Sequence, residues 1–132
     1  MNQPVLDYIS YYCTILPIQI ADQRTLEAEL WTTHGVRVEF MTLAEIADEG
    51  RLGEGNALYV KRGGGSMSSD SDNINDNDNE SLVSLTYFRA GNSPNDYPSE
   101  KEWRAREMIE RSAATKCPTV GYQLAGTVNQ EY

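Results

Sequence analysis

Strand-like and helix-like segments alternate along this chain, and that alternation limits its fold more than any other feature. Residues 5–16 are rich in β-branched and aromatic side chains, and residues 36–40 alternate as strand residues do. Each segment is followed by helix-type sequence, over residues 22–35 and 42–50. The β-α-β-α order predicts an α/β fold with an open, mostly parallel sheet in three layers, with helices on both faces.

Local signals set the expected helix boundaries. Asp22 is a plausible N-cap for the first helix. Thr42 and Glu45 have the spacing of a capping box, and Ser99 and Glu102 repeat it at the start of the strongest helical pattern. Three helices are therefore expected before residue 117.

The second half of the chain adds strands and one acidic segment. Residues 57–62 and 82–88 predict an antiparallel hairpin, and residues 119–126 predict a last short strand. Residues 63–80 between the hairpin strands carry five acidic and no basic side chains among Ser, Asn and Gly. Because such residues bury little apolar surface, this segment is expected to be a disordered acidic loop.

Length and charge limit the possible functions. The 132 residues predict a single domain, residues 1–132. The net charge of −9 argues against nucleic acid or an anionic membrane as the partner. Cys13 and Cys117 are too few for a disulfide framework or a zinc site, and no Lys or Arg precedes Arg24 as a signal peptide would require. A cytoplasmic protein without a membrane span is expected.

Metal and nucleophile chemistry find little support. An EF-hand loop starting at Asp70 would need Asp or Asn at position 74 and Gly at 75, where this chain has Ile74 and Asn75. The single histidine, His34, lies at a predicted helix end, where it would face the helix dipole. No catalytic residue and no metal ligand is therefore predicted.

Arg89 is the strongest candidate for a binding residue. It stands at the end of a predicted strand, where open α/β sheets place their ligand crevices, and Gly91 follows it. A guanidinium there could bind a carboxylate or phosphate through two hydrogen bonds. Spacing alone leaves open a second interpretation, an exposed arginine that pairs with Asp96 or Glu100.

Several stretches of the chain form one ordered set of motifs, among them YFRAG, DYPSEKEWRAREMIERSAATKCP and YQLAGT. Read together, and over roughly residues 20–62 and 81–127, they resemble the eukaryotic-type glutathione synthetase family. In that family this region is the substrate-binding domain of a longer ATP-grasp ligase. The whole enzyme joins γ-glutamylcysteine to glycine, with ATP and magnesium as cofactors. The acidic segment falls where the family has a short hairpin connection.

The resemblance carries over to individual residues unevenly. Arg89 matches the arginine of the family's Arg-x-Gly-Tyr motif, which contacts γ-glutamylcysteine, and Gln23 matches another substrate contact. Asn92 stands in place of the motif's tyrosine. Pro17 and Gln19 occupy the places of a Glu and an Asn that also contact substrate. The resemblance thus implies a site built from Arg89 and Gln23, with Asn92 and Gln19 as replacements.

These matches imply a substrate-binding domain of a glutathione synthetase-like ligase, present as a fragment or a diverged relative. Val128 and Asn129 replace the family's paired lysines, one of which faces ATP phosphates. The isolated chain is therefore expected to be inactive and to hold no cofactor, and its status as an enzyme stays uncertain. Its partners would be a small peptide substrate and a second copy or a missing ATP-grasp portion. The alternative is a non-catalytic binding or interaction module with the same fold.

Overall fold

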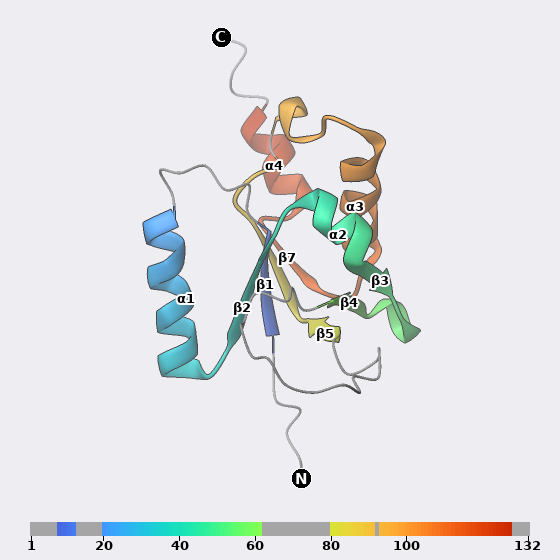
Figure 1. Ribbon diagram of the computed structural model, residues 1–132. Helices are drawn as coiled ribbons and strands as arrows, with labels where there is room; N and C mark the ends of the chain where they lie inside the picture. The colour runs from blue at the N-terminus through green and yellow to red at the C-terminus, as the bar shows by residue number, and fades with distance from the viewer. Residues whose placement is uncertain (1–7, 13–19, 62–79, 92, 128–132) are drawn as a thin grey trace.

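The computed structural model describes residues 8–12, 20–61, 80–91 and 93–127, and it shows a mixed α/β protein (Figure 1). The α/β class is thus confirmed. In chain order the elements are β1 (Tyr8–Tyr12), α1 (Ile20–His34), β2 (Arg37–Met41), α2 (Leu43–Glu49), β3 (Gly50–Leu52), a 3-10 turn (Glu54–Asn56), β4 (Leu58–Lys61), β5 (Glu80–Val83), β6 (Leu85–Phe88), a second 3-10 turn (Pro94–Asp96), α3 (Glu100–Arg111), β7 (Thr115–Cys117) and α4 (Val120–Thr127).

The strands divide between two small sheets rather than forming one. Four of them form a sheet in the order β2-β1-β6-β7, in which each neighbouring pair is parallel. The other three form an antiparallel sheet in the order β3-β4-β5. The antiparallel pairing of β4 with β5 confirms the predicted hairpin, but the prediction of one continuous sheet was wrong. Only Ser84 separates β5 from β6, so the chain passes from one sheet to the other over a single residue.

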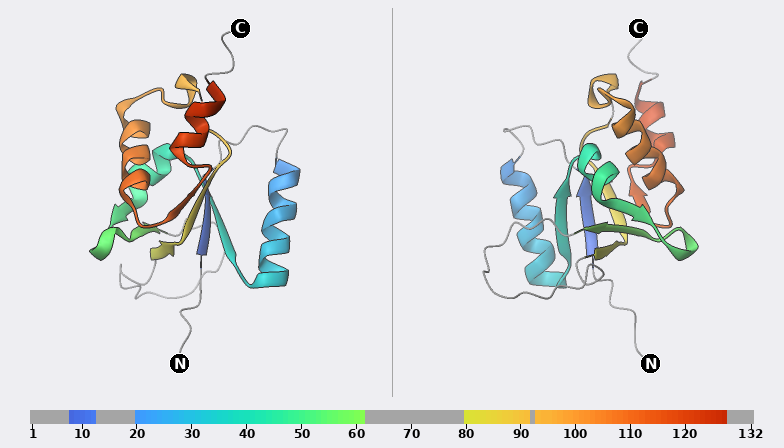
Figure 2. Two further views of the ribbon diagram at one scale, coloured as in Figure 1. Left: turned by 180° about the vertical axis from the view of Figure 1, so that it is seen from behind. Right: turned by 45° about the vertical axis from the view of Figure 1, so that its right-hand side comes forward.

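Helices lie on either side of the four-stranded sheet. In Figures 1 and 2, α1 stands on one side of it, and α2, α3 and α4 lie on the other. Helix α1 packs against β2, whereas α2 packs mainly against α3. Within the part of the chain that the structure describes, no helix is long and apolar enough to cross a membrane.

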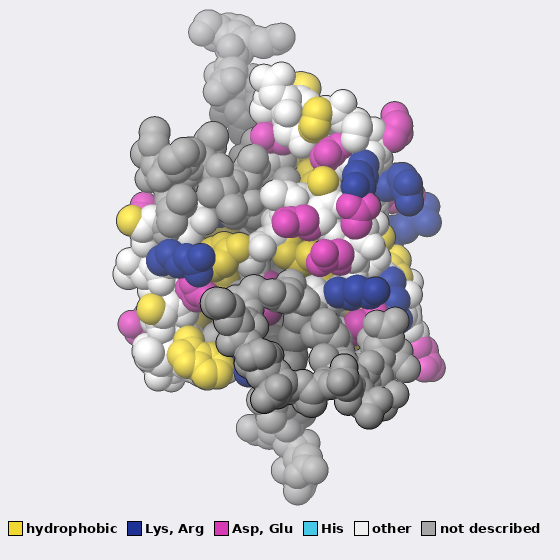
Figure 3. All heavy atoms as spheres, viewed as in Figure 1, with side chains coloured by type: hydrophobic (Ala, Val, Ile, Leu, Met, Phe, Trp, Pro, Cys, Tyr) yellow, Lys and Arg dark blue, Asp and Glu magenta, His cyan; other side chains and the backbone are white. Residues whose placement is uncertain are grey.

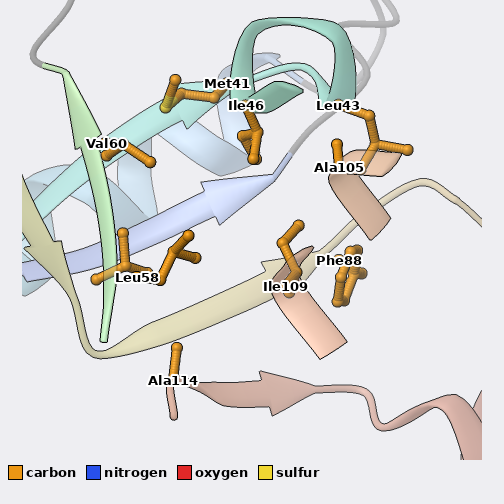
Figure 4. Close-up of a cluster of buried hydrophobic side chains, with 10 residues drawn as sticks. Met41, Leu43, Ile46, Leu58, Val60, Phe88, Ala105, Ile109 and Ala114 are labelled. Atoms are coloured by element: carbon orange, nitrogen blue, oxygen red, sulfur yellow. The ribbon is translucent and has the colours of Figure 1, made fainter. Parts of the chain in front are cut away.

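The main core lies between α2, α3 and the strands (Figure 4). Leu43 and Ile46 of α2 face Ala105 and Ile109 of α3, and all four side chains are buried. The remaining buried apolar members of this cluster are Met41, Leu58, Val60, Val83, Phe88 and Ala114. Full burial of a Leu or Ile side chain stabilises a fold by about 1.5–3 kcal/mol, so this cluster fixes α2 and α3 on the strands.

Both predicted capping boxes are present. The backbone N–H of Thr42 donates to Glu45 Oε2 at 2.7 Å, and the N–H of Glu45 donates to Thr42 Oγ1 at 3.2 Å. At α3 the N–H of Ser99 donates to Glu102 Oε2 at 3.0 Å. These bonds satisfy backbone donors that the first turn of a helix leaves unpaired.

Two predicted boundaries were wrong. Helix α1 begins at Ile20, so Asp22 lies within its first turn instead of capping it. Residues 120–126 lie in helix α4, not in a strand; the last strand in the described part of the chain is β7, which ends at Cys117 before Pro118. Pro118 has no N–H to donate to a ladder, and Val120 and Leu124 have the i,i+4 spacing of one helix face.

Charged side chains are mixed on the surface. On the face shown in Figure 3, acidic and basic side chains lie interspersed. Lys101 of α3 pairs with Asp48 of α2, and Arg51 of β3 pairs with Glu80 of β5. Glu80 belonged to the predicted acidic loop but lies in a strand, while residues 63–79 are outside the described residues.

Candidate functional site

Three strands of the four-stranded sheet end together at one edge. In the register of the sheet, Tyr12 of β1 lies beside Met41 of β2 and beside Phe88 of β6. Helix α1 begins at this same edge, which is uppermost in Figure 1, and α4 lies there too. The carboxyl ends of parallel strands are where open α/β sheets bind their ligands.

Arg89 follows β6 directly and so lies at this edge. It is half-buried and takes part in an interaction within the fold. The backbone turns at Gly91, whose φ is +92°, a backbone conformation that residues other than glycine rarely adopt. A Cβ added to Gly91 would also lie 3.0 Å from the Tyr97 hydroxyl, so glycine suits this position in two ways.

Two side chains from the following segment hold the turn. Asp96 Oδ2 accepts hydrogen bonds from the backbone N–H of Gly91 at 2.9 Å and from that of Ser93 at 3.1 Å. The Tyr97 hydroxyl donates to the carbonyl oxygen of Gly91 at 3.0 Å. Both backbone polar groups of Gly91 are therefore bound by side chains.

Arg106 of α3 contacts Tyr97, one of the two residues that hold the turn. Its side chain is buried, and it pairs with Glu110 one helical turn later, with Nη2 2.8 Å from Oε1. Nη1 donates to the Tyr97 hydroxyl at 3.4 Å, and Nη2 donates to Gln123 Oε1 at 2.6 Å. A single guanidinium thus connects α3, α4 and the segment after the turn.

A pocket of about 340 Å³ opens beside the turn. Its walls are mostly apolar, and the rings of Tyr97 and Trp103 stack there with their centroids 4.1 Å apart. The lining residues are Gly91, Ser93, Pro94, Tyr97, Trp103, Arg106, Val120, Gln123 and Leu124. Arg89 is not among them, so the pocket adjoins the turn at residues 89–91 but does not include the Arg89 guanidinium.

The predicted site residues can be placed in part. Gln23 lies in the first turn of α1 and is buried, with 6% of its surface exposed. The structure therefore brings Gln23 and Arg89 to the same edge of the sheet. Gln19 and Asn92 lie outside the described residues.

Sequence reasoning missed the residues that support the turn. Asp96 appeared only as a possible partner of Arg89, and Tyr97 and Arg106 were not singled out. One signal was available: Ser93-Pro94-Asn95-Asp96 has the spacing of a capping box, which the structure contains. The contact of Arg106 with Tyr97 had no such signal, since it depends on packing between segments.

Comparison with known proteins agrees with the resemblance noted in the sequence. Residues 17–125 match the family described as eukaryotic glutathione synthase. The chain is 40% identical over 106 residues to the chloroplastic glutathione synthetase of Arabidopsis thaliana, a match that covers 80% of this chain and 16% of that protein. It is 38% identical over 109 residues to glutathione synthetase of Dictyostelium discoideum, covering 81% and 20% of the two chains.

Animal relatives give the same result. Glutathione synthetase of Homo sapiens is 35% identical over 114 residues, which cover 85% of this chain and 20% of that protein. The chain therefore spans only a fifth or less of the length of these relatives. Because the family match extends over most of the chain, this protein belongs to the eukaryotic glutathione synthase family and corresponds to one part of it.

Proposed function

We propose that this chain is a substrate-binding domain that takes γ-glutamylcysteine at the carboxyl edge of its four-stranded sheet. The observation that carries the proposal is the position of Arg89, directly after β6 at the edge where β1 and β2 also end. This is the kind of position at which parallel strands present ligand-binding groups. Gln23, at the start of α1, lies at the same edge.

The chemistry of the two side chains fits a short acidic peptide. A guanidinium offers a planar pair of donors to a carboxylate, and its charge is permanent. An amide side chain such as that of Gln23 can both donate and accept. In the resemblance to the family, Arg89 and Gln23 are the two substrate contacts that this chain retains, while Gln19 and Asn92 stand where other contacts would be.

One anchor of this kind supports only weak binding. A hydrogen bond to a charged group is worth about 1.5–3 kcal/mol, whereas micromolar affinity needs about 8 kcal/mol. We therefore expect a millimolar dissociation constant for γ-glutamylcysteine. This affinity would be measured by NMR titration of the 132-residue chain.

Arg89→Ala tests the proposal directly. The variant should bind γ-glutamylcysteine at least about tenfold more weakly, the loss expected for one charge-assisted hydrogen bond. Arg104→Ala is the matched control, because Arg104 is an exposed arginine on α3 and its removal changes the net charge equally. Equal binding by the natural chain and Arg89→Ala would contradict the proposal.

The same proposal predicts that the isolated chain does not ligate. Phosphoryl activation of a carboxylate needs bound metal and cationic side chains around the phosphates. The chain matches only a fifth or less of its relatives, and Val128 and Asn129 replace the family's lysine pair. ADP release with γ-glutamylcysteine, glycine, magnesium and ATP should not exceed that of a sample without protein; clear turnover would contradict this expectation.

A second candidate is a non-catalytic interaction module. It is favoured by helix α4, where Val120 and Leu124 lie one helical turn apart on the same face and are 45% and 62% exposed. Large apolar side chains exposed close together mark interaction surfaces in other proteins. If the titration shows no binding of γ-glutamylcysteine, this function becomes the leading one.

A further inference from the structure

The turn after β6, residues 89–91, has contacts with side chains of residues 96–106 both before and after Arg89. Before Arg89, the ring of Phe88 lies under the guanidinium of Arg106, with Cζ 4.1 Å from the ring centroid. After it, Gly91 is bound through its N–H by Asp96 and through its carbonyl by Tyr97. Phe88 and Gly91, which flank Arg89 and Ala90, are thus both held by side chains of residues 96–106.

Asp96 makes the central contact of this arrangement. Its Oδ2 atom accepts from two backbone donors, Gly91 at 2.9 Å and Ser93 at 3.1 Å, which stand on either side of position 92. Charge-assisted hydrogen bonds of this kind are stronger than bonds between neutral groups. One carboxylate oxygen therefore holds the backbone N–H groups of Gly91 and Ser93, two and four residues after Arg89.

Tyr97 extends the same support to the helix. Its hydroxyl donates to Gly91 and accepts from Arg106 Nη1 at 3.4 Å, and its ring stacks on Trp103. Stacking and the two hydrogen bonds leave the tyrosine little rotational freedom. Since Arg106 is itself bound to Glu110 and Gln123, the turn is connected through Tyr97 to helices α3 and α4.

We infer that Asp96, supported by Tyr97, is a positioning residue that sets the direction of the Arg89 side chain toward the ligand. The inference rests on the proposed function, because it takes Arg89 as the ligand contact. It adds that Asp96 acts through the turn and never touches γ-glutamylcysteine itself. A long side chain such as arginine loses less entropy on binding when the backbone that carries it is already fixed.

The test is a double-mutant cycle measured by NMR titration with γ-glutamylcysteine. Asp96→Ala should weaken binding roughly fivefold, the order of effect of losing one or two hydrogen bonds. Asp96→Asn retains an oxygen that can accept from both N–H groups, so it should restore most of the affinity. Asp48→Ala, which removes an exposed aspartate that pairs with Lys101, is the control and should bind as the natural chain does.

The double variant distinguishes positioning from direct contact. If Asp96 acts through Arg89, then Arg89→Ala with Asp96→Ala should bind no more weakly than Arg89→Ala alone. Additive losses would mean that Asp96 acts independently of Arg89, and they would overturn the inference. The inference would also be overturned if Asp96→Ala bound γ-glutamylcysteine as tightly as the natural chain does.

Amide hydrogen exchange gives a measurement that needs no ligand. In Asp96→Ala the amides of Gly91 and Ser93 should exchange faster, while the amide of Ile46 in α2 should be unchanged. Unchanged exchange at Gly91 and Ser93 would also overturn the inference. If Arg89→Ala has no effect on the binding of γ-glutamylcysteine, the proposed function and this inference both fail. If Arg89→Ala weakens binding but Asp96→Ala does not, only the inference fails.

Discussion

The guanidinium of Arg106 lies over the ring of Phe88, with its Cζ atom 4.1 Å from the ring centroid. This contact connects the middle of α3 to the last residue of β6. The same side chain is bound to Glu110, Tyr97 and Gln123, so one buried cation joins elements that are far apart in sequence. A buried charge is costly unless all of its donors are paired, and here the pairs also hold the α3–α4 side together.

Replacing this arginine should destabilise the fold. Arg106→Ala removes the stacking on Phe88 and leaves Gln123 without its partner, and Gln123 Nε2 already lacks one in the described structure. We expect the free energy of unfolding to fall by about 1.5–3 kcal/mol, the range for a hydrogen bond to a charged group. Urea denaturation followed by circular dichroism measures this change.

Arg111→Ala is the matched control for that experiment. Arg111 lies on the same helix and also pairs with a glutamate four residues away, Glu107, but both side chains are more than half exposed. An exposed pair of this kind contributes little, so the free energy of unfolding should change by less than about 0.5 kcal/mol. Similar losses in the two variants would contradict the role assigned to Arg106.

Contacts between neighbours in sequence were predictable, and contacts between segments were not. Thr42 with Glu45 and Ser99 with Glu102 are three residues apart, so their pairing follows from helix geometry alone. The pairing of Arg106 with Glu110, four residues later, follows from helix geometry too. The contacts of Arg106 with Phe88, Tyr97 and Gln123 arise only after the strands and helices have packed. For this reason the sequence placed Arg89 at the end of a strand but carried no sign that Arg106 supports the turn after it.

The end of the chain shows a second limit. Residues 119–126 contain Val120 and Tyr122, which favour strands, but Val120 and Leu124 also fit one face of a helix. A short apolar run satisfies both patterns, and the structure shows the helix. Similarly, the sequence predicted the hairpin of β4 and β5 but carried no sign that these strands belong to a separate sheet from β6.

The capping box of α3 predicts a pH effect. The hydrogen bond from the Ser99 hydroxyl lowers the pKa of Glu102 below its ordinary value of 4.5. A carboxyl whose pKa is lower in the folded state stabilises the fold above its ordinary pKa. That contribution is lost as the pH falls from about 4.5 through the lowered value.

Ser99→Ala should therefore raise the pKa of Glu102 toward 4.5, as followed by the carboxyl carbon shift in an NMR pH titration. Ser99→Thr keeps the hydroxyl and should keep the lowered pKa. Thr42→Ala, which removes the capping box of α2, should leave the pKa of Glu102 unaffected. An unchanged pKa in Ser99→Ala would mean that the hydroxyl is not the main cause.

The last prediction concerns residues 62–79, which connect β4 to β5. Lys61 lies opposite Glu80 in the antiparallel register, so the two strand ends are adjacent and a two-residue Asn-Gly turn can join them. Glu80 has to stay, because it belongs to β5 and pairs with Arg51. Shortening the connection in this way should increase the free energy of unfolding by up to about 2 kcal/mol, since a shorter loop costs less entropy to close.

A second variant separates length from sequence in that experiment. Replacing residues 62–79 with a Gly/Ser segment of equal length changes the side chains but leaves the closure entropy nearly the same. Urea denaturation should give the Gly/Ser variant the same free energy of unfolding as the natural chain, and the shortened variant a higher one. A loss of stability in both variants would mean that side chains of residues 62–79 contribute to the folded state, because removal of these side chains is the change that the two variants share.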